Sequence, residues 1–369
     1  MGKCKICGEE GVNISNVLGY CSQCLRNYWD SIKEEIFSLH AASRQSFGLP
    51  PYVTKNPEGI QCRLCVNKCV ISSQEVGYCG IRKNINGKIG GGTIKGNLHF
   101  YYDPLPTNCV ADWVCPGGTG SGYPQYAYTK GPELGYYNLA VFYQACNFNC
   151  LYCQNWSFKE GFRHPHWVSI NELVEACFKK NVSCICYFGG DPTPQIIHAL
   201  AVSRKILKRK DKSIIRICWE TNGAVNPKIL KQMAKISLAS GGCIKFDLKA
   251  WHEGVHKALC GVSNRQTLEN FAWLASLSKK RPSPPFLIAS TLLVPGYVDV
   301  EEVRKITHFI AQLDSNIPYS LLAFYPSFVL RDLPTTSFSH AERCMEVAKQ
   351  AGLKRIKIGN QHLLGNAYT

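Results

Sequence analysis

The chain has 369 residues, of which 45% are hydrophobic, 11% aromatic and 18% charged. This composition excludes disorder over most of the chain, because disordered chains combine low hydrophobicity with a dominating charge. The length allows two or three domains. The longest apolar stretches, such as residues 320–330, are far shorter than the roughly 20 residues of a membrane-spanning helix. Because the first residues, MGKC, also lack the apolar run of a secretory signal, we expect a cytoplasmic protein without a membrane span.

The chain is basic, with 42 lysines and arginines against 26 acidic residues and a net charge of +16. A strongly positive protein can bind nucleic acid or another polyanion. The basic residues are spread over predicted helix surfaces, for example in residues 203–212, and do not form one long basic tail. Solvated helix faces therefore explain the charge more simply than nucleic-acid binding does.

Twenty cysteines are the most unusual feature of the composition. Without a secretory signal we expect a reducing environment, which disfavours a disulfide framework and favours metal binding. Eight of the cysteines lie in closely spaced sets before residue 80, and three more lie within residues 146–153. Each set therefore calls for its own interpretation.

The first set consists of two CxxC pairs separated by a polar loop that contains glycine. A tetrahedral zinc ion takes four thiolates from two tight turns of this kind, and such a site stabilises a segment that is too short to have its own core. We therefore predict a small zinc ribbon over residues 1–30, with a redox role or an iron–sulfur cluster as the alternative. The predicted ligands are Cys4, Cys7, Cys21 and Cys24.

A second set follows a helical segment and proline-rich linker over residues 31–60, in which the helix is expected around 27–43. It lies in a cysteine-rich module that we assign to residues 61–135. Four thiolates suit zinc or an iron–sulfur cluster, and the spacing does not choose between them. The ligands of this set are Cys62, Cys65, Cys69 and Cys79. Cys109 and Cys115 either add ligands or, as we favour, are small buried or loop residues.

From residue 136 onward, runs of β-branched or aromatic residues alternate with amphipathic helical patterns. The predicted strands are 138–144, 183–188, 214–219, 243–248, 286–294 and 319–325. The predicted helices are 170–180, 195–210, 227–239, 267–279, 300–313 and 340–351. Six successive βα units imply an α/β fold with a parallel sheet, arranged as an open or partial barrel or as a doubly wound sheet.

Polar and glycine-rich segments follow five of these strands, where the ligands of parallel α/β folds bind. After the first strand, Cys146, Cys150 and Cys153 lie on one short loop. A [4Fe-4S] cluster held by three cysteines leaves one iron open for a substrate or cofactor, whereas a closed zinc site would need a fourth ligand such as Cys177. At the end of the fourth strand, Asp247 and Lys249 are two residues apart and should point to the same side.

Several other residues are expected to have structural roles. Cysteine is a small apolar side chain when it lies within a strand. We therefore predict core packing for Cys184, Cys186, Cys218 and Cys243. Three histidines on helical patterns, His198, His308 and His340, are expected at the surface or in the core, whereas His256 is either functional or hydrogen-bonded as a cap.

The loop after the first strand resembles the signature of the radical S-adenosylmethionine (SAM) superfamily, Cys-x3-Cys-x-aromatic-Cys, with Tyr152 at the aromatic position. The resemblance implies a partial (β/α)6 barrel over residues 136–369 and a [4Fe-4S] cluster on Cys146, Cys150 and Cys153. It also implies reductive cleavage of SAM to a 5′-deoxyadenosyl radical that abstracts hydrogen from a substrate. The SAM contacts that it implies are Tyr152, Gly189, Gly190, Asp191, Asn222, Asp247 and Lys249.

Within the superfamily, the chain is similar to pyruvate formate-lyase activating enzymes and their relatives. This similarity rests on the segments CLYCQNW at 150–156, DLK at 247–249, VPG at 294–296 and FYP at 324–326, and on His256 followed by Gly261. Residues 62–86 are similar to the AMMECR/Memo-associated subgroup. Two features depart from the activating enzymes: Gln144 and Ala145 precede Cys146 where a Phe-x-Gly pattern is usual, and the extra cysteines lie upstream of the cluster loop.

The resemblance implies an enzyme with a flavodoxin or ferredoxin-type electron donor, and the upstream cysteines as zinc ligands or as ligands of an auxiliary iron–sulfur cluster. The substrate that the resemblance implies is a protein, as in activation of glycyl-radical enzymes. One alternative is a small molecule or lipid. The alternative from another class, a non-enzymatic zinc protein that binds nucleic acid, leaves the motifs at the strand ends unexplained.

Overall fold

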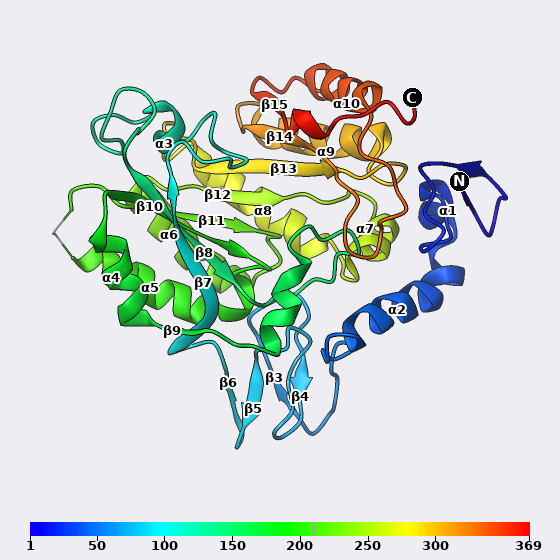
Figure 1. Ribbon diagram of the computed structural model, residues 1–369, viewed down its shortest axis with the longest axis horizontal. Coiled ribbons are helices and arrows are strands. Elements are labelled where there is room, and N and C mark those ends of the chain that lie inside the picture. The colour runs from blue at the N-terminus through cyan, green and yellow to red at the C-terminus, as the bar shows by residue number, and fades with distance from the viewer. Residues whose placement is uncertain (210–211) are drawn as a thin grey trace.

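The computed structural model describes residues 1–209 and 212–369. An open nine-stranded sheet dominates it, in the order β15-β14-β13-β12-β11-β10-β8-β7-β9 (Figure 1). The strands from β8 to β15 in this order pair in parallel, and β7 pairs antiparallel with both β8 and β9. The bounds are β7 Lys95–Pro104, β8 Tyr137–Tyr143, β9 Trp167–Ser169, β10 Val182–Gly189, β11 Arg216–Thr221, β12 Ile244–Asp247, β13 Leu287–Leu293, β14 Tyr319–Ala323 and β15 Ile356–Gly359.

All six predicted strands are present, as β8 and β10 to β14, with ends that differ by at most two residues from the prediction. The parallel α/β class is therefore confirmed. Three strands of this nine-stranded sheet were not predicted, namely β7, β9 and β15. The β7 strand comes from the segment assigned to the cysteine-rich module, and it extends the sheet because it pairs with β8 over seven residues.

Helices cover the outer face of this sheet (Figure 1). Their bounds are α4 Ile170–Lys179, α5 Ile196–Lys208, α6 Pro227–Ser240, α7 Glu253–Cys260, α8 Arg265–Ser278, α9 Val300–Asp314 and α10 Phe338–Gln350. The sequence predicted all of them except α7. The predicted helix over residues 195–210 corresponds to α5, and its last residue, Lys210, lies outside the described residues. Among the helices of the described ranges, none is long and apolar enough to cross a membrane.

The sheet curls, and the evidence is that strands near both of its ends line one internal cavity. Tyr101 of β7 and Asn138 of β8 lie on the wall of this cavity together with Ile358 of β15, although β7 and β15 are far apart in the strand order. The curled sheet forms an open barrel, which is one of the two arrangements predicted from the succession of βα units. The carboxyl ends of the parallel strands consequently converge on one side of the molecule, towards α7 (Figure 1).

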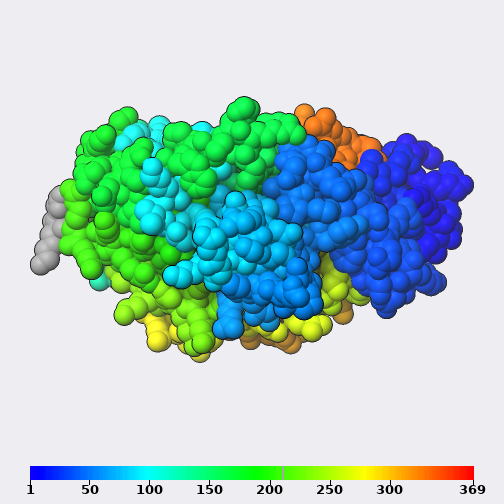
Figure 2. Space-filling model, turned by 90° about the horizontal axis from the view of Figure 1, so that it is seen from below, coloured from blue at the N-terminus to red at the C-terminus, as the bar shows by residue number. Residues whose placement is uncertain are grey.

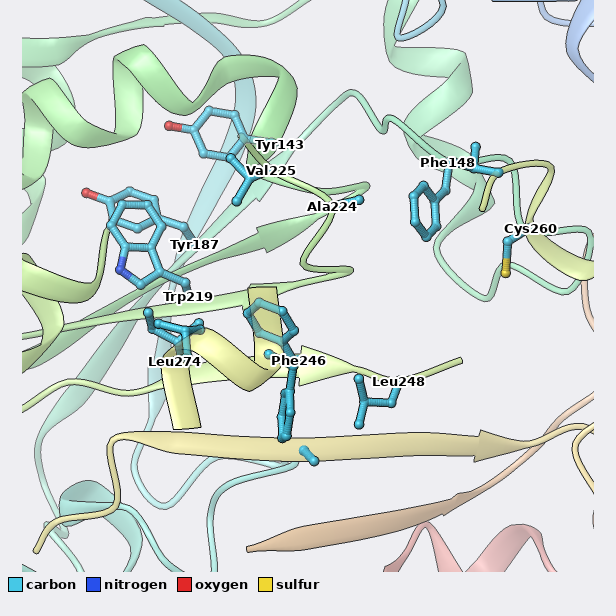
Figure 3. Close-up of a cluster of buried hydrophobic side chains, with 14 of the residues drawn as sticks. Tyr143, Phe148, Tyr187, Trp219, Ala224, Val225, Phe246, Leu248, Cys260 and Leu274 are labelled. Atoms are coloured by element: carbon cyan, nitrogen blue, oxygen red, sulfur yellow. The ribbon is translucent and has the colours of Figure 1, made fainter. Parts of the chain in front are cut away.

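The core between sheet and helices is aromatic. Tyr187 of β10 stacks on Trp219 of β11 with ring centroids 4.7 Å apart, and Tyr143 of β8 lies next to them (Figure 3). All three side chains are fully buried. Aromatic pairs of this kind add to the burial of large apolar surfaces, so they hold three neighbouring strands together.

The N-terminal segments run along the lower side of the molecule and lie side by side there (Figure 2). Arg26 of α1 connects them to the barrel, because its guanidinium forms ion pairs with Asp299, Glu301 and Glu302 at the start of α9.

The helix predicted around residues 27–43 is α2. The elements are β1 Gly2–Lys3, β2 Glu10–Gly11, α1 Ser22–Asn27, α2 Trp29–Gln45, β3 Ile60–Gln61, β4 Val70–Ile71, β5 Lys83–Ile85 and β6 Lys88–Gly90; the short helices α3 Pro116–Thr119, η1 Trp156–Phe162, η2 Thr193–Gln195 and η3 Gln361–Leu363 lie further along the chain.

A buried ion pair ties the 105–136 connection to the sheet. The Glu133 carboxylate accepts two hydrogen bonds from Arg216, at 2.9 and 2.6 Å, and one from Ser183 Oγ at 2.6 Å. Neither charged side chain of the pair is exposed by more than 2%. Burial raises the pKa of Glu133, but the hydrogen bonds and charge of Arg216 outweigh burial and leave this pKa below its ordinary value.

Replacing Glu133 by Gln should lower the free energy of unfolding by about 3–5 kcal/mol, because the Arg216 charge stays buried without its partner. The control is Glu175→Gln, which removes a surface pair with Arg209 and should cost no more than about 1 kcal/mol. Denaturant unfolding measures both. In the wild type, the contribution of Glu133 is present above its unfolded pKa and is lost as the pH falls through the lower folded pKa. Equal costs for the two variants would contradict this account.

Candidate functional site

A cavity of about 190 Å³ lies at the carboxyl ends of the strands. Every residue that the sequence analysis assigned to the cluster or to SAM lines this cavity. These residues come from the loops that follow β8, β10, β11 and β12, so the fold brings together segments separated by about a hundred residues of sequence. They are Cys146, Cys150, Tyr152, Cys153, Gly189, Gly190, Asp191, Asn222, Asp247 and Lys249.

The three cysteines of the predicted cluster lie on the loop between β8 and η1, whose backbone is held by neighbouring segments. The end of α7 accepts two hydrogen bonds from this loop, from Asn149 N to Cys260 O and from Leu151 N to Leu259 O, both 2.9 Å long. On the other side, the Leu151 carbonyl accepts a hydrogen bond of 2.8 Å from Val329 N. The loop is therefore fixed by main-chain contacts that do not depend on its own residue types.

The N-terminal segments hold the same loop through side chains. The Asn67 amide donates to the carbonyl of Asn147 at 2.7 Å. The Asn149 amide donates to His40 Nδ1 at 3.0 Å, and His40 Nε2 bonds to the carbonyl of Ala258 at 3.0 Å. Burial lowers the pKa of His40 to about 4, so this imidazole is neutral at pH 7 with its proton on Nε2. A neutral His40 thus joins α2, α7 and the cysteine loop.

Positive charge surrounds the cysteines. Lys159 of η1 is 1% exposed, and its ammonium donates to the side-chain oxygen of Asn149. A hydrogen bond from Cys260 lowers the pKa of Cys150 to about 7 against the effect of burial, and the charges of Lys249 and Lys159 act in the same direction. Three thiols on one cavity wall with a buried and a partly buried lysine suit a [4Fe-4S] cluster, which needs thiolates and carries their negative charge.

The glycines after β10 allow two backbones to approach closely. A Cβ atom at Gly189 would lie 2.4 Å from the backbone nitrogen of Tyr143, and one at Gly190 would lie 2.3 Å from the carbonyl oxygen of Ala145. The next residue, Asp191, is buried and accepts hydrogen bonds of 2.8–2.9 Å from Thr193 N, Asn222 N and the Thr221 hydroxyl. Together these contacts tie the ends of β8, β10 and β11 into one rigid edge.

The Asp247 and Lys249 side chains point to the same side, as predicted, since they form an ion pair of 3.0 Å. The second carboxylate oxygen of Asp247 accepts a hydrogen bond of 2.7 Å from Ser290 Oγ on β13. Asn222 donates to Asn147 Oδ1 at 2.8 Å and lies 3.9 Å from Cys146 Sγ. These polar groups therefore line the cavity beside the cysteines.

The sequence analysis missed Lys159, Glu220 and Ser290, which also line this cavity. Glu220 lies near the end of β11, which was the only available signal for it, whereas Ser290 lies in the middle of β13. Lys159 follows the cysteine loop in an aromatic stretch, where a lysine predicts a surface residue. Only the packing of η1 shows that this ammonium is buried.

The thiol sulfurs of Cys4, Cys7, Cys21 and Cys24 all lie within 4.8 Å of one another, as a single tetrahedral ion requires. The second set of cysteines comes together around a smaller cavity, which Asn67 and Arg82 also line. The fold therefore gathers the ligand atoms of the first set as one ion requires, and it places the four cysteines of the second set around one cavity. The second set contacts the site region as well, because Val66 N donates to the carbonyl of Ala224 in the loop after β11.

The histidines outside the N-terminal segments have structural environments. His256 is buried within α7, and its Nδ1 bonds to the carbonyl of Val262 beyond the helix end at 2.6 Å. Burial lowers its pKa to about 4. This is a structural hydrogen bond and not a cap, since His252 caps the start of α7. His198 and His340 are buried and hydrogen-bonded to Tyr143 and Tyr368, whereas His308 is exposed. None of these four lines the cavity at the strand ends.

A second cavity of about 610 Å³ adjoins the first inside the curl of the sheet. The four strand cysteines that were expected to pack in the core line it, together with both cysteines of the 105–121 connection. The expectation was incomplete, because strand alternation placed these side chains on the inner face, and a curled sheet leaves space there. They are Cys109, Cys115, Cys184, Cys186, Cys218 and Cys243.

Comparison with known proteins supports this picture. A family model described as the radical SAM superfamily matches residues 140–310. An uncharacterized protein of Methanocaldococcus jannaschii is 25% identical over 312 residues, which cover 82% of this chain and 81% of that protein. The pyruvate formate-lyase 1-activating enzyme of Escherichia coli (strain K12) is 28% identical over 181 residues, covering 47% of this chain and 66% of that enzyme. The isethionate sulfite-lyase activating enzyme of Oleidesulfovibrio alaskensis is 25% identical over 159 residues, covering 43% and 47%.

The family match extends from β8 into α9 and includes the cysteine loop and the strand ends that form the cavity. The relatives with named activities match slightly less than half of this chain, and these matches span 66% and 47% of those relatives. From the cavity and these matches together, we conclude that the chain carries a radical SAM domain over residues 140–310 and is an enzyme of this superfamily that is similar to the pyruvate formate-lyase activating enzymes.

Proposed function

We propose that this enzyme binds a [4Fe-4S] cluster through Cys146, Cys150 and Cys153 and reductively cleaves SAM in the cavity at the strand ends. One observation carries the proposal: three thiols from one loop and polar groups from three other strand ends line a single cavity. The cluster, when bound, supplies the electron that breaks a carbon–sulfur bond of SAM and leaves a 5′-deoxyadenosyl radical. The protein supplies the geometry and the electrostatics.

The chain's own residues have three tasks in this proposal. Lys159 and Lys249 balance the negative charge of the thiolates, and the backbone contacts of the loop fix their positions. The ion pair of Asp247 with Lys249 presents one carboxylate and one ammonium to the charged amino-acid end of SAM. Phe188, Leu292 and Leu322 line the same cavity and exclude water from the reacting atoms, which protects a radical from side reactions.

We further propose that the hydrogen is abstracted from a protein and that a flavodoxin or ferredoxin-type protein donates the electron. The support for a protein substrate is that two similar enzymes are named as activators of other enzymes, pyruvate formate-lyase and isethionate sulfite-lyase. Contact of the second cysteine set with the cysteine loop adds support, because a partner bound to the N-terminal segments would lie close to the site.

Alanine at any one of Cys146, Cys150 and Cys153 should abolish SAM cleavage, because two thiolates do not hold the cluster with one open iron. The measurement is the formation of 5′-deoxyadenosine and methionine by the anaerobically reconstituted and reduced protein. Cys177→Ala is the matched control, since Cys177 is a buried thiol of α4 that does not line the cavity. Its cleavage rate should stay within a few-fold of the wild type.

Cleavage that persists in a variant without the cluster would contradict the proposed function. The same assay tests the substrate class. A cell extract is separated into dialysed macromolecules and a small-molecule filtrate, and each part is added to the assay. We expect the macromolecular part to raise 5′-deoxyadenosine formation and an organic radical to appear on a protein. Stimulation by the filtrate alone would instead identify a small molecule or lipid as the substrate.

For the N-terminal cysteine set, we propose a structural zinc ion on Cys4, Cys7, Cys21 and Cys24. A Zn–S distance of about 2.3 Å separates thiolates on one ion by about 3.8 Å, and Cys7 Sγ and Cys21 Sγ are 3.8 Å apart. Cys21→Ala should remove one zinc per chain, measured by elemental analysis, whereas Cys344→Ala in α10 should leave zinc unchanged. Full zinc content in the Cys21 variant, or iron in place of zinc in the wild type, would overturn this assignment.

A further inference from the structure

The cavity of about 610 Å³ inside the barrel is not explained by SAM cleavage. It lies directly beside the SAM cavity, because Val110, Phe188, Glu220 and Leu322 line both. We call it the lumen cavity. Its wall is formed by the inner faces of β7, β8, β10, β11, β12, β14 and β15 and by the connection over residues 105–121.

The inner face of this barrel is unusual in its residue types. Large branched side chains normally fill the interior of a parallel barrel. Here many of the positions that line the cavity are small, including Asn138, Ala140 and Ser320 in addition to the cysteines. Cys243 packs with Ala111, Val114 and Ile288, and Cys109, Cys115 and Cys218 pack against this cluster. All six cysteines nevertheless also border the cavity, so packing alone does not account for so many thiols there.

The positions of the cysteines follow from strand register. Cys184 and Cys186 are two residues apart on β10 and therefore share a face. Cys186 is paired in register with Cys218 of β11, and the sulfur of Cys218 lies 3.8 Å from that of Cys243 at the start of β12. Three adjacent strands thus present thiols to one side of the lumen cavity. Cys109 and Cys115 face them from the 105–121 connection.

A buried lysine lies among these thiols. The side chain of Lys245 is 3% exposed, and its ammonium is 3.0 Å from Cys109 Sγ and 3.1 Å from Cys186 Sγ. The same ammonium forms an ion pair of 2.9 Å with Glu220. Burying a charge is costly unless it is compensated, and a cation held between two sulfurs is a suitable partner for metal-bound thiolates.

The spacing of the thiols favours a cluster over a single ion. The Cys218–Cys243 distance equals the roughly 3.8 Å between two thiolates on one tetrahedral metal. Within residues 1–209 and 212–369, the only set of three or more metal-binding side chains whose ligand atoms all lie within 4.8 Å of one another is the N-terminal one, so no three lumen thiols are spaced for one ion. Several irons bridged by sulfide connect thiolates over longer distances than one ion does.

We propose that the lumen cavity holds a second iron–sulfur cluster, ligated by Cys186, Cys218 and Cys243 from the sheet side and by Cys109 from the 105–121 connection, with Lys245 beside it as the compensating charge. Its ligands are distinct from the three cysteines of the SAM site and from the two N-terminal sets. The shared wall residues would place this cluster next to the position at which SAM is cleaved, so it is suited to contact the substrate or an electron-transfer path.

The test counts iron in a background that lacks the SAM-site ligands, with Cys146, Cys150 and Cys153 all replaced by alanine. After anaerobic reconstitution with iron and sulfide, this protein is compared with two derivatives by iron and sulfide analysis and Mössbauer spectroscopy. One derivative adds Cys218→Ala and Cys243→Ala. The matched control adds Cys177→Ala and Cys344→Ala, which remove two buried thiols that do not line the lumen cavity. The second N-terminal set is unchanged in both derivatives.

We expect the lumen derivative to lose the iron and sulfide of one cluster per chain and the control derivative to keep them. Equal iron in the two derivatives, or zinc in place of iron at this site, would overturn the proposal. If the lumen derivative does not fold, Cys109→Ala replaces it, because Cys109 lies on a connection outside the strands, and the same loss is expected. Iron binding in this background does not require SAM cleavage, so failure here and failure of the proposed function are distinguishable.

Discussion

The backbone of the cysteine loop after β8 is the constraint on which the site depends. A cluster held by three cysteines needs their sulfurs in one arrangement, yet the loop that carries them is short and irregular. Its position is set by hydrogen bonds that it donates to α7 and His40 and by hydrogen bonds that it accepts from Val329 and Asn67. The loop is thus fixed by its surroundings, which are far from it in sequence.

This arrangement gives the N-terminal segments a role in the site. His40 of α2 is neutral because it is buried, and only the neutral imidazole both accepts from Asn149 and donates to Ala258. Arg26 in turn fixes the first segment to α9 by three ion pairs. Metal binding by the N-terminal cysteines would therefore stabilise the region that holds the cluster loop, without any metal there taking part in the chemistry.

Much of the barrel could be predicted from the sequence, because its strands and helices have strong local patterns and the three cysteines have a specific spacing. The ten residues expected around the cluster and SAM indeed line one cavity. The pairing of β7 with β8 could not be predicted, since β7 belongs by sequence to the cysteine-rich region. Lys159 was missed because its burial depends on how η1 packs. The lumen cavity was missed because the curl of the sheet, and not the type of residue, decides whether space remains between the strands.

Electron paramagnetic resonance of the reduced protein, with and without SAM, tests the central claim most directly. The account predicts a [4Fe-4S]⁺ signal in the wild type that changes when SAM binds the open iron. It also predicts that this SAM-dependent change disappears when Cys146, Cys150 and Cys153 are all replaced by alanine, whether or not signals from other cysteines remain. A fully reconstituted wild-type protein whose signal does not respond to SAM would contradict the account.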